Sequence, residues 1–345
     1  MNYIKKLCKA TGIFLLKFAV VIVINVIVFI TTMRVGIYGN LQEKLVTSVM
    51  VTMNHQYLAK LVATDSRIAL VMANNKVEQT SDVTDKSVIN IDANRSSNEN
   101  TQNPINSKGS VDLVDIQGTN YKGHMFIISN PKRVRLAVSE NLGSSGTKLN
   151  DLIKKENGIG GVNAGGFTDT GGHGNGGEPT GIIIKDGKVV WRDTTESNYN
   201  IIGFDKNGIL LLGNYTINQI KKLNIVDAVS FGPYLIVNDK PTKIIGDGGW
   251  GYNPRTVIGQ RSDGTVLLLV IDGRQPTYSI GATIRDIQNI MISYGAVNAA
   301  NLDGGSSTVM YYKDKLINKP CSPYGQRPLP DAWIITGDTA SAQFN

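Results

Sequence analysis

The residues with the clearest capacity for chemistry are 301–308, which read Asn-Leu-Asp-Gly-Gly-Ser-Ser-Thr. A carboxylate, Asp303, stands here beside two glycines and three hydroxyls. Glycine lets a ligand approach the backbone closely, while the carboxylate and the hydroxyls supply acceptors and donors. The segment predicts the floor of a polar pocket, although a tight turn would use the same residue types. The candidate catalytic residue is Asp303, and the candidate substrate contacts are Asn301, Gly304, Gly305, Ser306 and Ser307.

A second candidate element is the glycine-rich stretch 161–179. Gly172, Gly174 and Gly177 formally match a dinucleotide fingerprint, but Pro179 and a strand-like run follow where a helix would have to begin. We interpret the stretch as a flap over a pocket. An exposed loop position is the alternative for its histidine. The candidate site residues of the flap are Asn163, Gly165, Gly166, His173, Asn175 and Glu178.

Two arginines flank a predicted hairpin. Arg255 precedes one strand and Arg274 follows the next, with a turn at 262–264 between the strands. This hairpin would bring both guanidinium groups to one edge of a sheet. Because the planar guanidinium binds phosphate in a bidentate manner, the pair suggests an anionic substrate. Pairing with nearby carboxylates, such as Asp272, is the alternative.

The region after Val111 alternates short β-branched runs with turn signals, which predicts strands. The predicted strands are 124–129, 133–138, 180–185, 208–212, 265–271 and 308–312. Helical patterns occupy 149–157, 216–223 and 283–294, the last with Thr283 as N-cap and Gly295 at its end. We therefore expect an α+β fold with a mixed or antiparallel sheet and packed helices.

The N-terminal region carries an apolar run at 13–33, long enough to cross a bilayer as a helix. Lysines before the run and near its start place residues 1–12 in the cytoplasm by the positive-inside tendency. A cleaved signal peptide is the alternative, but the run is long for one and ends without small residues. We expect a single-pass cell-membrane protein whose globular region is extracellular.

Between the apolar run and the globular region lie two further segments. Residues 34–74 carry apolar residues at helical spacing, which predicts a membrane-proximal helical stalk, with packing against the globular region as the alternative. Residues 75–110 are rich in Asn, Ser, Thr, Asp and Lys, which predicts a disordered linker. The remaining residues, 111–345, form the expected globular domain.

The charge and the cysteines exclude some classes of protein. The net charge of +7 owes much to the flanks of the apolar run, so nucleic acid is not an expected partner. Cys8 and Cys321 would lie on opposite sides of the membrane and could not pair in one chain. The fold must therefore be stabilised by its core.

Six motifs occur in a fixed order along the chain. They are Asn163-Ala-Gly-Gly-Phe, Gly232-Pro, Pro254-Arg-Thr, Asp272-Gly-Arg, Asn301-Leu-Asp-Gly-Gly-Ser-Ser and Arg327-Pro. Together they resemble the phosphodiester glycosidase family over roughly 111–336. The resemblance implies an extracytoplasmic hydrolase that cleaves a sugar-1-phosphodiester or phosphoglycan, and a role in exopolysaccharide or cell-wall metabolism. The chain departs from the family pattern at Ala164 and at Gln326, where a glutamate is usual.

This reaction suggests roles for the candidate residues. Its transition state resembles an oxocarbenium ion, so it needs a carboxylate near the anomeric carbon and positive charge on the phosphate. We expect Asp303 to be that carboxylate, with Asp272 or Glu178 as a second acidic group. Arg255 and Arg274 would bind the phosphate. The remaining expected substrate contacts are Asn163, Ser306, Ser307 and Arg327.

Three questions stay open at this point. The acidic residues offer hard oxygen ligands for Ca²⁺ or Mg²⁺, although no calcium-loop spacing is present and no metal ligand is assigned. A wall-glycan binding protein without catalysis would use the same pocket. A metal-dependent phosphodiesterase would instead cut the P–O bond.

Overall fold

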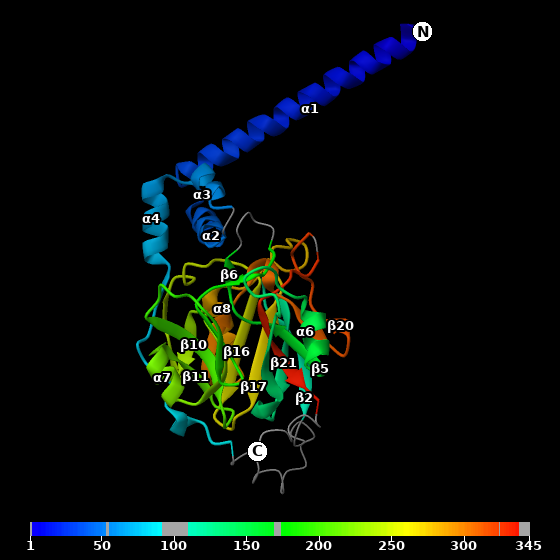
Figure 1. Cartoon of the computed structure of the whole chain (residues 1–345). Helices are drawn as coiled ribbons and strands as arrows, with labels where there is room; N and C mark the ends of the chain where they lie inside the picture. The colour runs from blue at the N-terminus through cyan, green and yellow to red at the C-terminus, as the bar shows by residue number, and fades with distance from the viewer. Residues whose placement is uncertain (1, 53–54, 92–109, 169–173, 324, 338–345) are drawn as a thin grey trace, which may run out of the picture.

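The computed structural model describes residues 2–52, 55–91, 110–168, 174–323 and 325–337. Three β-sheets form the body of this structure, and helices lie on their outer faces and at one end (Figure 1). The strand pairings are antiparallel throughout the three sheets as described. The expected α+β class is confirmed.

The largest sheet carries the elements that matter most for the site. It has seven strands in the order β14-β13-β18-β16-β17-β3-β2. The predicted hairpin of two buried strands lies near its centre. Its strands are β2 (Val111–Gln117), β3 (Lys122–Ile128), β13 (Tyr234–Val237), β14 (Lys240–Pro241), β16 (Arg255–Arg261), β17 (Val266–Ile271) and β18 (Ala296–Leu302).

Among the described residues, two five-stranded sheets pack against the first, and two short two-stranded ribbons are also present. One sheet, in the order β11-β10-β12-β8-β9, contains β8 (Ile182–Lys185), β9 (Lys188–Arg192), β10 (Asn198–Asp205), β11 (Leu210–Thr216) and β12 (Ile225–Val229). The other, in the order β20-β19-β5-β21-β4, contains β4 (Val134–Val138), β5 (Gly158–Asn163), β19 (Met310–Tyr312), β20 (Lys315–Leu316) and β21 (Asp331–Thr336). The ribbons pair β1 (Lys76–Glu78) with β15 (Lys243–Ile245) and β6 (Phe167–Thr168) with β7 (Glu178–Pro179).

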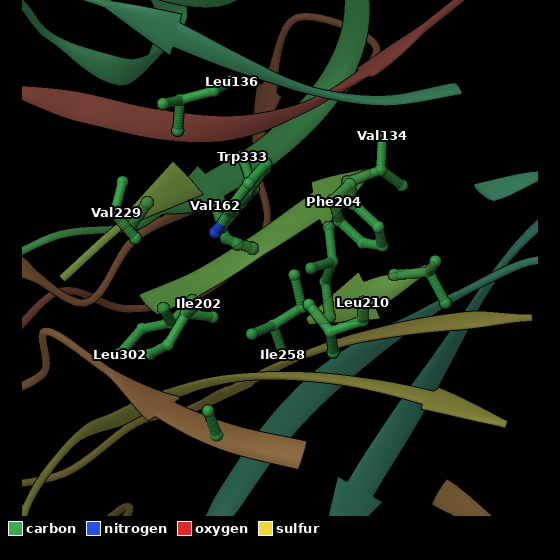
Figure 2. Packing of buried hydrophobic residues seen from close by; sticks show 14 of the residues in the cluster. Val134, Leu136, Val162, Ile202, Phe204, Leu210, Val229, Ile258, Leu302 and Trp333 are labelled. Carbon is green, nitrogen blue, oxygen red and sulfur yellow. The ribbon is translucent and has the colours of Figure 1, made fainter. Parts of the chain in front are cut away.

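The main core lies where the three sheets meet. Ile258, Phe204 and Trp333 each come from a different sheet and are buried in one apolar cluster (Figure 2). The rings of Phe204 and Trp333 meet edge to face, with centroids 5.4 Å apart. This shared core joins the sheets into one body and holds the ends of their strands in fixed positions.

In the part of the chain that the structure describes, the helices that cover the sheets are α6 (Leu149–Lys155), α7 (Ile217–Lys222) and α8 (Ile284–Ser293). Helix α8 begins as predicted, because Thr283 and Asp286 form a reciprocal capping box. Its buried face includes Ile287 and Met291, which pack in a second apolar cluster with residues of β16 and β17. The short β16–β17 loop and this helix hold the largest sheet rigid.

Four helices form the N-terminal part: α1 (Asn2–Arg34), α2 (Gly39–Met50), α3 (Tyr57–Val62) and α4 (Asp65–Asn74). Thr11–Arg34 is long and apolar enough to cross a membrane, with a mean hydropathy of 3.0. A helix of this kind near an N-terminus suits either an anchor or a signal sequence.

Helices α2 to α4 do not form a free stalk. They pack together around Val46 and Ala59, with Met33 of α1 buried among them. Helix α2 also contacts the sheet domain, where Thr47 Oγ1 donates to Asp247 Oδ2 at 2.7 Å. The alternative expectation, packing against the globular region, is what the structure shows.

The expectation of a disordered linker is wrong for residues 75–91. Strand β1 pairs with β15, and Ile89 is buried in the apolar cluster beneath α7. Lys86 Nζ lies 2.7 Å from the carboxylate of Asp205. A few apolar residues inside a polar stretch are enough to bind it to the domain. Residues 92–109 lie outside the described residues.

Candidate active site

The site forms where three strands of the largest sheet end together. In the antiparallel register, Arg255 pairs with Ile271, and Thr256 pairs with Leu302. The residues just after β17 and β18 therefore emerge at the same end of the sheet as the start of β16. Arg274 and Asp303 both lie at this end.

Asp303 is held in place by its backbone. Its N–H donates to the carbonyl of Ala164 at 3.0 Å, and its own carbonyl accepts from Asn163 Nδ2 at 2.6 Å. Asn163 Oδ1 in turn accepts from Thr256 Oγ1 at 2.7 Å and from the Val309 N–H at 3.1 Å. These bonds connect the Asp303 turn to β5 and β16.

The same bonds correct the expected role of Asn163. Its side chain is buried, with a relative exposure of 1%, and it donates and accepts within the fold. Asn163 positions the Asp303 turn instead of presenting a donor to a ligand.

The environment of Asp303 favours an anionic ligand nearby. Burial raises the pKa of its carboxyl to about 6, and the Ser307 hydroxyl, Arg327, the Gly304 N–H and Arg274 each act to lower it. At neutral pH the group is therefore mostly ionised, with two guanidinium groups around it. A half-buried carboxylate near two cations is an arrangement that suits a negatively charged ligand, and it makes Asp303 a candidate functional residue.

Arg274 is exposed and held over the turn. Its Nε donates to Asn253 Oδ1 at 3.0 Å, and Nη1 donates to Ser306 Oγ at 3.4 Å. Gly305 has φ +59°, and a Cβ there would lie 3.2 Å from Arg274 Nη2. The glycine therefore allows the guanidinium to lie against the Asp303 turn, with further N–H groups available to a ligand.

Arg327 is the second arginine whose charge acts on Asp303, and it comes from another part of the chain. Its guanidinium lies 5.2 Å from the centroid of the Phe167 ring. Gly174 has φ +63°, and a Cβ there would lie 2.0 Å from Arg327 Nε. The flap glycine thus makes room for this arginine, which explains why glycine is required in that part of the flap.

Arg255, expected to bind a ligand, is instead a buried structural residue. Its Nε donates to the Ala282 carbonyl at 2.9 Å, and Nη2 donates to the carbonyls of Trp250 and Gly251 at 2.8 and 2.7 Å. Burial, followed by the nearby charge of Arg274, lowers its pKa to about 9. The expected guanidinium pair is correct in position, but only Arg274 is exposed to a ligand.

We expect Arg255→Met to lower the free energy of unfolding by about 2–4 kcal/mol, because three carbonyls lose a charged donor and Asn253 remains as a donor to only two of them. Urea denaturation of the full chain in detergent would measure it. Arg274→Met, at an exposed position, is the matched control and should change stability by less than about 1 kcal/mol. Equal stability of the two variants would contradict the structural role of Arg255.

Asp272 also has a structural role, contrary to the expectation of an acidic catalytic group. Its Oδ1 accepts from Asn318 Nδ2 at 2.9 Å and from the Lys319 N–H at 3.0 Å, while Oδ2 accepts from the Tyr278 hydroxyl at 3.2 Å. Burial raises its pKa, and these hydrogen bonds act in the opposite direction. Both oxygens are used to hold the 318–319 loop to the end of β17.

Other candidates hold the fold around the site. Asn301 is buried and its Nδ2 donates to the Gly232 carbonyl at 2.9 Å. A Cβ on Gly304 would lie 2.7 Å from the Pro254 carbonyl oxygen, and one on Gly166 would lie 2.7 Å from the Phe231 ring. These positions need their residue types for packing.

The proposed roles of two flap residues, Glu178 and His173, are not decided by the structure. Glu178 is exposed on β7, where it pairs with Thr168. Its acidic role stays a prediction. His173 lies outside the described residues.

Asp331 is a site residue that the sequence did not indicate. It begins β21, is 1% exposed, and its Oδ1 accepts from the Gly165 N–H at 2.5 Å. Its Oδ2 is buried without a hydrogen-bond partner. Burial raises its pKa to about 7, the Gly165 N–H acts against this shift, and the charge of Asp303 adds to it. The signal available in the sequence was a carboxylate, Asp331, at the start of an apolar strand-like run.

A small pocket adjoins the flap. The pocket, of about 150 Å³, is lined by Thr180, Gly181, Glu196, Asn200, Ser230 and Phe231. It adjoins Gly166, which packs on Phe231 and Thr180. Over the described ranges, no three His, Cys, Asp or Glu side chains gather as metal ligands.

Comparison with known proteins identifies the family. The phosphodiester glycosidase family model matches residues 156–336, just over half of the chain. The chain therefore belongs to the phosphodiester glycosidase family. It is also 30% identical over 177 residues to the SPbeta prophage-derived uncharacterized protein YomE of Bacillus subtilis (strain 168), covering 48% of this chain and only 26% of that protein.

A solved structure supports the fold. The catalytic domain of zebrafish N-acetylglucosamine-1-phosphodiester alpha-N-acetylglucosaminidase, described as auto-inhibited by its pro-peptide, is similar with a TM-score of 0.53. The sequences are 20% identical, and the match covers 69% of this chain and 86% of the zebrafish chain. At this identity, the similarity concerns the fold alone.

Proposed function

We propose that the chain hydrolyses a sugar-1-phosphodiester at the bond between the sugar C1 and the phosphodiester oxygen. One observation carries the proposal: the Arg274 guanidinium lies against the Asp303 turn, where Nη1 donates to Ser306 Oγ at 3.4 Å. The charges of Arg274 and Arg327 also act on Asp303, against the rise in pKa that burial causes. In the reaction, water adds to C1, the C1–O bond breaks, and the sugar and a phosphate monoester are released. Membership of the family supports this class of substrate.

Asp303, Arg274 and Arg327 each have a role in this reaction. Asp303 stabilises the positive charge that develops at C1 in the transition state. Arg274 and Arg327 bind the phosphate and stabilise the negative charge that it gains as it leaves. Because a phosphate ester is already a good leaving group, the reaction has little need for a strong general acid.

We propose that α1 remains as an anchor with its N-terminus in the cytoplasm, so that the site lies outside and acts on a cell-surface phosphoglycan. Protease added to intact cells would then degrade the sheet domain, and its complete protection would contradict this topology.

The test of the proposed function uses the full chain in detergent. It is incubated with a panel of sugar-1-phosphodiesters that differ in sugar and aglycone, and free reducing sugar is measured. We expect release from at least one member of the panel. Binding of panel members without any release would favour the glycan-binding alternative.

The two carboxyls predict a bell-shaped pH profile. Activity should rise as Asp303 ionises near pH 6, and it should fall above about pH 7 as Asp331 ionises and adds a second negative charge beside an anionic substrate. Asp331→Asn keeps an oxygen for the Gly165 N–H but cannot ionise. We therefore expect the variant to retain the acidic limb and to lose the alkaline one.

The measurement is kcat/KM between pH 5 and about pH 9 for the parent and the variant. A purely structural role of Asp331 would lower activity at every pH without changing the shape of the profile. An unchanged alkaline limb in Asp331→Asn would contradict the titration of Asp331.

A further inference from the structure

The candidate site lies at the end of the domain from which α1 leaves (Figure 1). A short series of contacts connects them. Met33, in the last turn of α1, is buried against the helices, and its carbonyl accepts from Gln42 Nε2 of α2 at 2.7 Å. Further along α2, the Ser48 carbonyl accepts from Asn253 Nδ2 at 3.3 Å, and Asn253 Oδ1 accepts from Arg274 Nε at 3.0 Å. The chain leaves α1 and reaches the site within the length of one helix.

That length is small on the scale of a membrane. Helix α2 has 12 residues, which corresponds to roughly 18 Å. If α1 crosses a bilayer, Arg274 is held within a few nanometres of its surface. Packing of α2 on the loop that contacts Arg274 fixes this position, because no long flexible segment intervenes between α1 and α2.

Apolar side chains are exposed at this same end. Tyr57 of α3 is 60% exposed and Ile37, between α1 and α2, is 64% exposed. Ile280 is 46% exposed and lies in the loop after β17, where its carbonyl accepts from the Arg274 N–H at 3.0 Å. Large apolar and tyrosine side chains beside an apolar helix are typical of a surface that meets the bilayer interface.

We propose, on the basis of the hydrolase function above, that the substrate is lipid-linked: its aglycone is a lipid in the membrane that α1 enters. A lipid tail in that membrane would present the phosphodiester at headgroup level, where Arg274 is exposed. Ile280 would contact the bilayer beside the site. We call Tyr57, Ile37 and Ile280 the apolar rim. The lipid surface itself is what covers this rim.

The test compares three forms of one sugar-1-phosphodiester, using the full chain reconstituted in vesicles. The aglycone is a dialkyl lipid in the same vesicles, the same lipid in separate vesicles, or a soluble butyl group. We expect the lipid substrate in the same vesicles to be hydrolysed at least about tenfold faster than in separate vesicles, because confinement to one membrane raises its effective concentration. Equal rates in the two vesicle arrangements, or an equally fast soluble substrate, would overturn the proposal.

A matched pair of variants tests the apolar rim. Ile280→Asp should lower hydrolysis of the lipid substrate severalfold and leave the soluble substrate unaffected, because a charge opposes contact with the interface. Ile292 is similarly exposed, at 44%, but lies near the far end of the 10-residue helix α8, roughly 12 Å from its start. Ile292→Asp should therefore leave both rates unchanged.

The possible failures can be told apart. If Ile280→Asp behaves like Ile292→Asp on the lipid substrate, the contact with the bilayer is wrong. If the soluble form is hydrolysed as fast as the lipid form, the enzyme activity stands and the lipid-linked substrate does not. If none of the three forms is hydrolysed with any sugar of the panel above, the proposed function itself is overturned, and this inference with it.

Discussion

Asp303→Asn should lower kcat by about 1000-fold or more on any sugar-1-phosphodiester that the parent chain hydrolyses. The amide preserves the size of the side chain but removes the negative charge that would stabilise the developing cation at C1. The backbone bonds of Asp303 to Ala164 and Asn163 do not involve its side chain, so the turn should keep its shape. The loss should therefore appear mainly in kcat.

The control for this variant is Asp314→Asn. Asp314 is exposed, with φ +61°, in the turn after β19. The register of β19 on β5 runs from Val162 to Gly160, so this turn lies at the end of β19 away from Asn163, and the substitution makes the same chemical change there. It should keep full activity. Denaturation midpoints of both variants would exclude unfolding as the cause, and an active Asp303→Asn variant would rule out the carboxylate at C1.

Arg274→Ala should lower kcat/KM by roughly 100- to 1000-fold, because it removes a charged donor from the phosphate. Arg274 itself is exposed, its bond to Ser306 is exposed and its bond to Asn253 is partly buried, so stability should change by less than about 1 kcal/mol. Arg274→Lys should restore part of the loss, since lysine supplies the charge without the planar fork. Steady-state kinetics on the phosphodiester would measure both variants.

Two comparisons sharpen the test of Arg274. Arg192→Ala, at an exposed position on β9, should leave activity unchanged. A neutral glycoside of the same sugar, if hydrolysed, should be much less sensitive to Arg274→Ala than the phosphodiester. An equal loss on both substrates would show that Arg274 does not act on the phosphate.

Much of the frame of the site could be predicted from the sequence. The turn at 262–264 and its flanking apolar runs predicted the β16–β17 hairpin, whose register puts Arg255 and the β17 end together. The Thr283 capping box was visible as a local pattern. Such features depend on residues close in sequence, so local physical rules are sufficient.

The roles of individual polar residues could not be predicted in the same way. Asn163 is bonded to Asp303, Asp331 to Gly165, and Asp272 to Asn318, and each pair is far apart in the chain. Whether a polar side chain faces a ligand or a buried carbonyl depends on such partners. Composition alone gives the same signal for both cases.

Arg255 illustrates the limit most clearly. The predicted hairpin put Arg255 at the same end of the sheet as Arg274, where the structure also has it. However, the carbonyls that accept hydrogen bonds from Arg255 belong to the Trp250 loop and to Ala282, which the hairpin did not indicate. The position of a guanidinium therefore follows from strand pairing, whereas its availability depends on how loops pack around it.

Hydrolysis in water enriched in oxygen-18 tests the central claim most directly. The full chain is incubated with a sugar-1-phosphodiester, and the two products are analysed by mass spectrometry. Cleavage at the sugar carbon, assisted by Asp303 and the two arginines, predicts that the label enters the C1 hydroxyl of the sugar. Label in the released phosphate would show that the P–O bond is cut and would contradict the account.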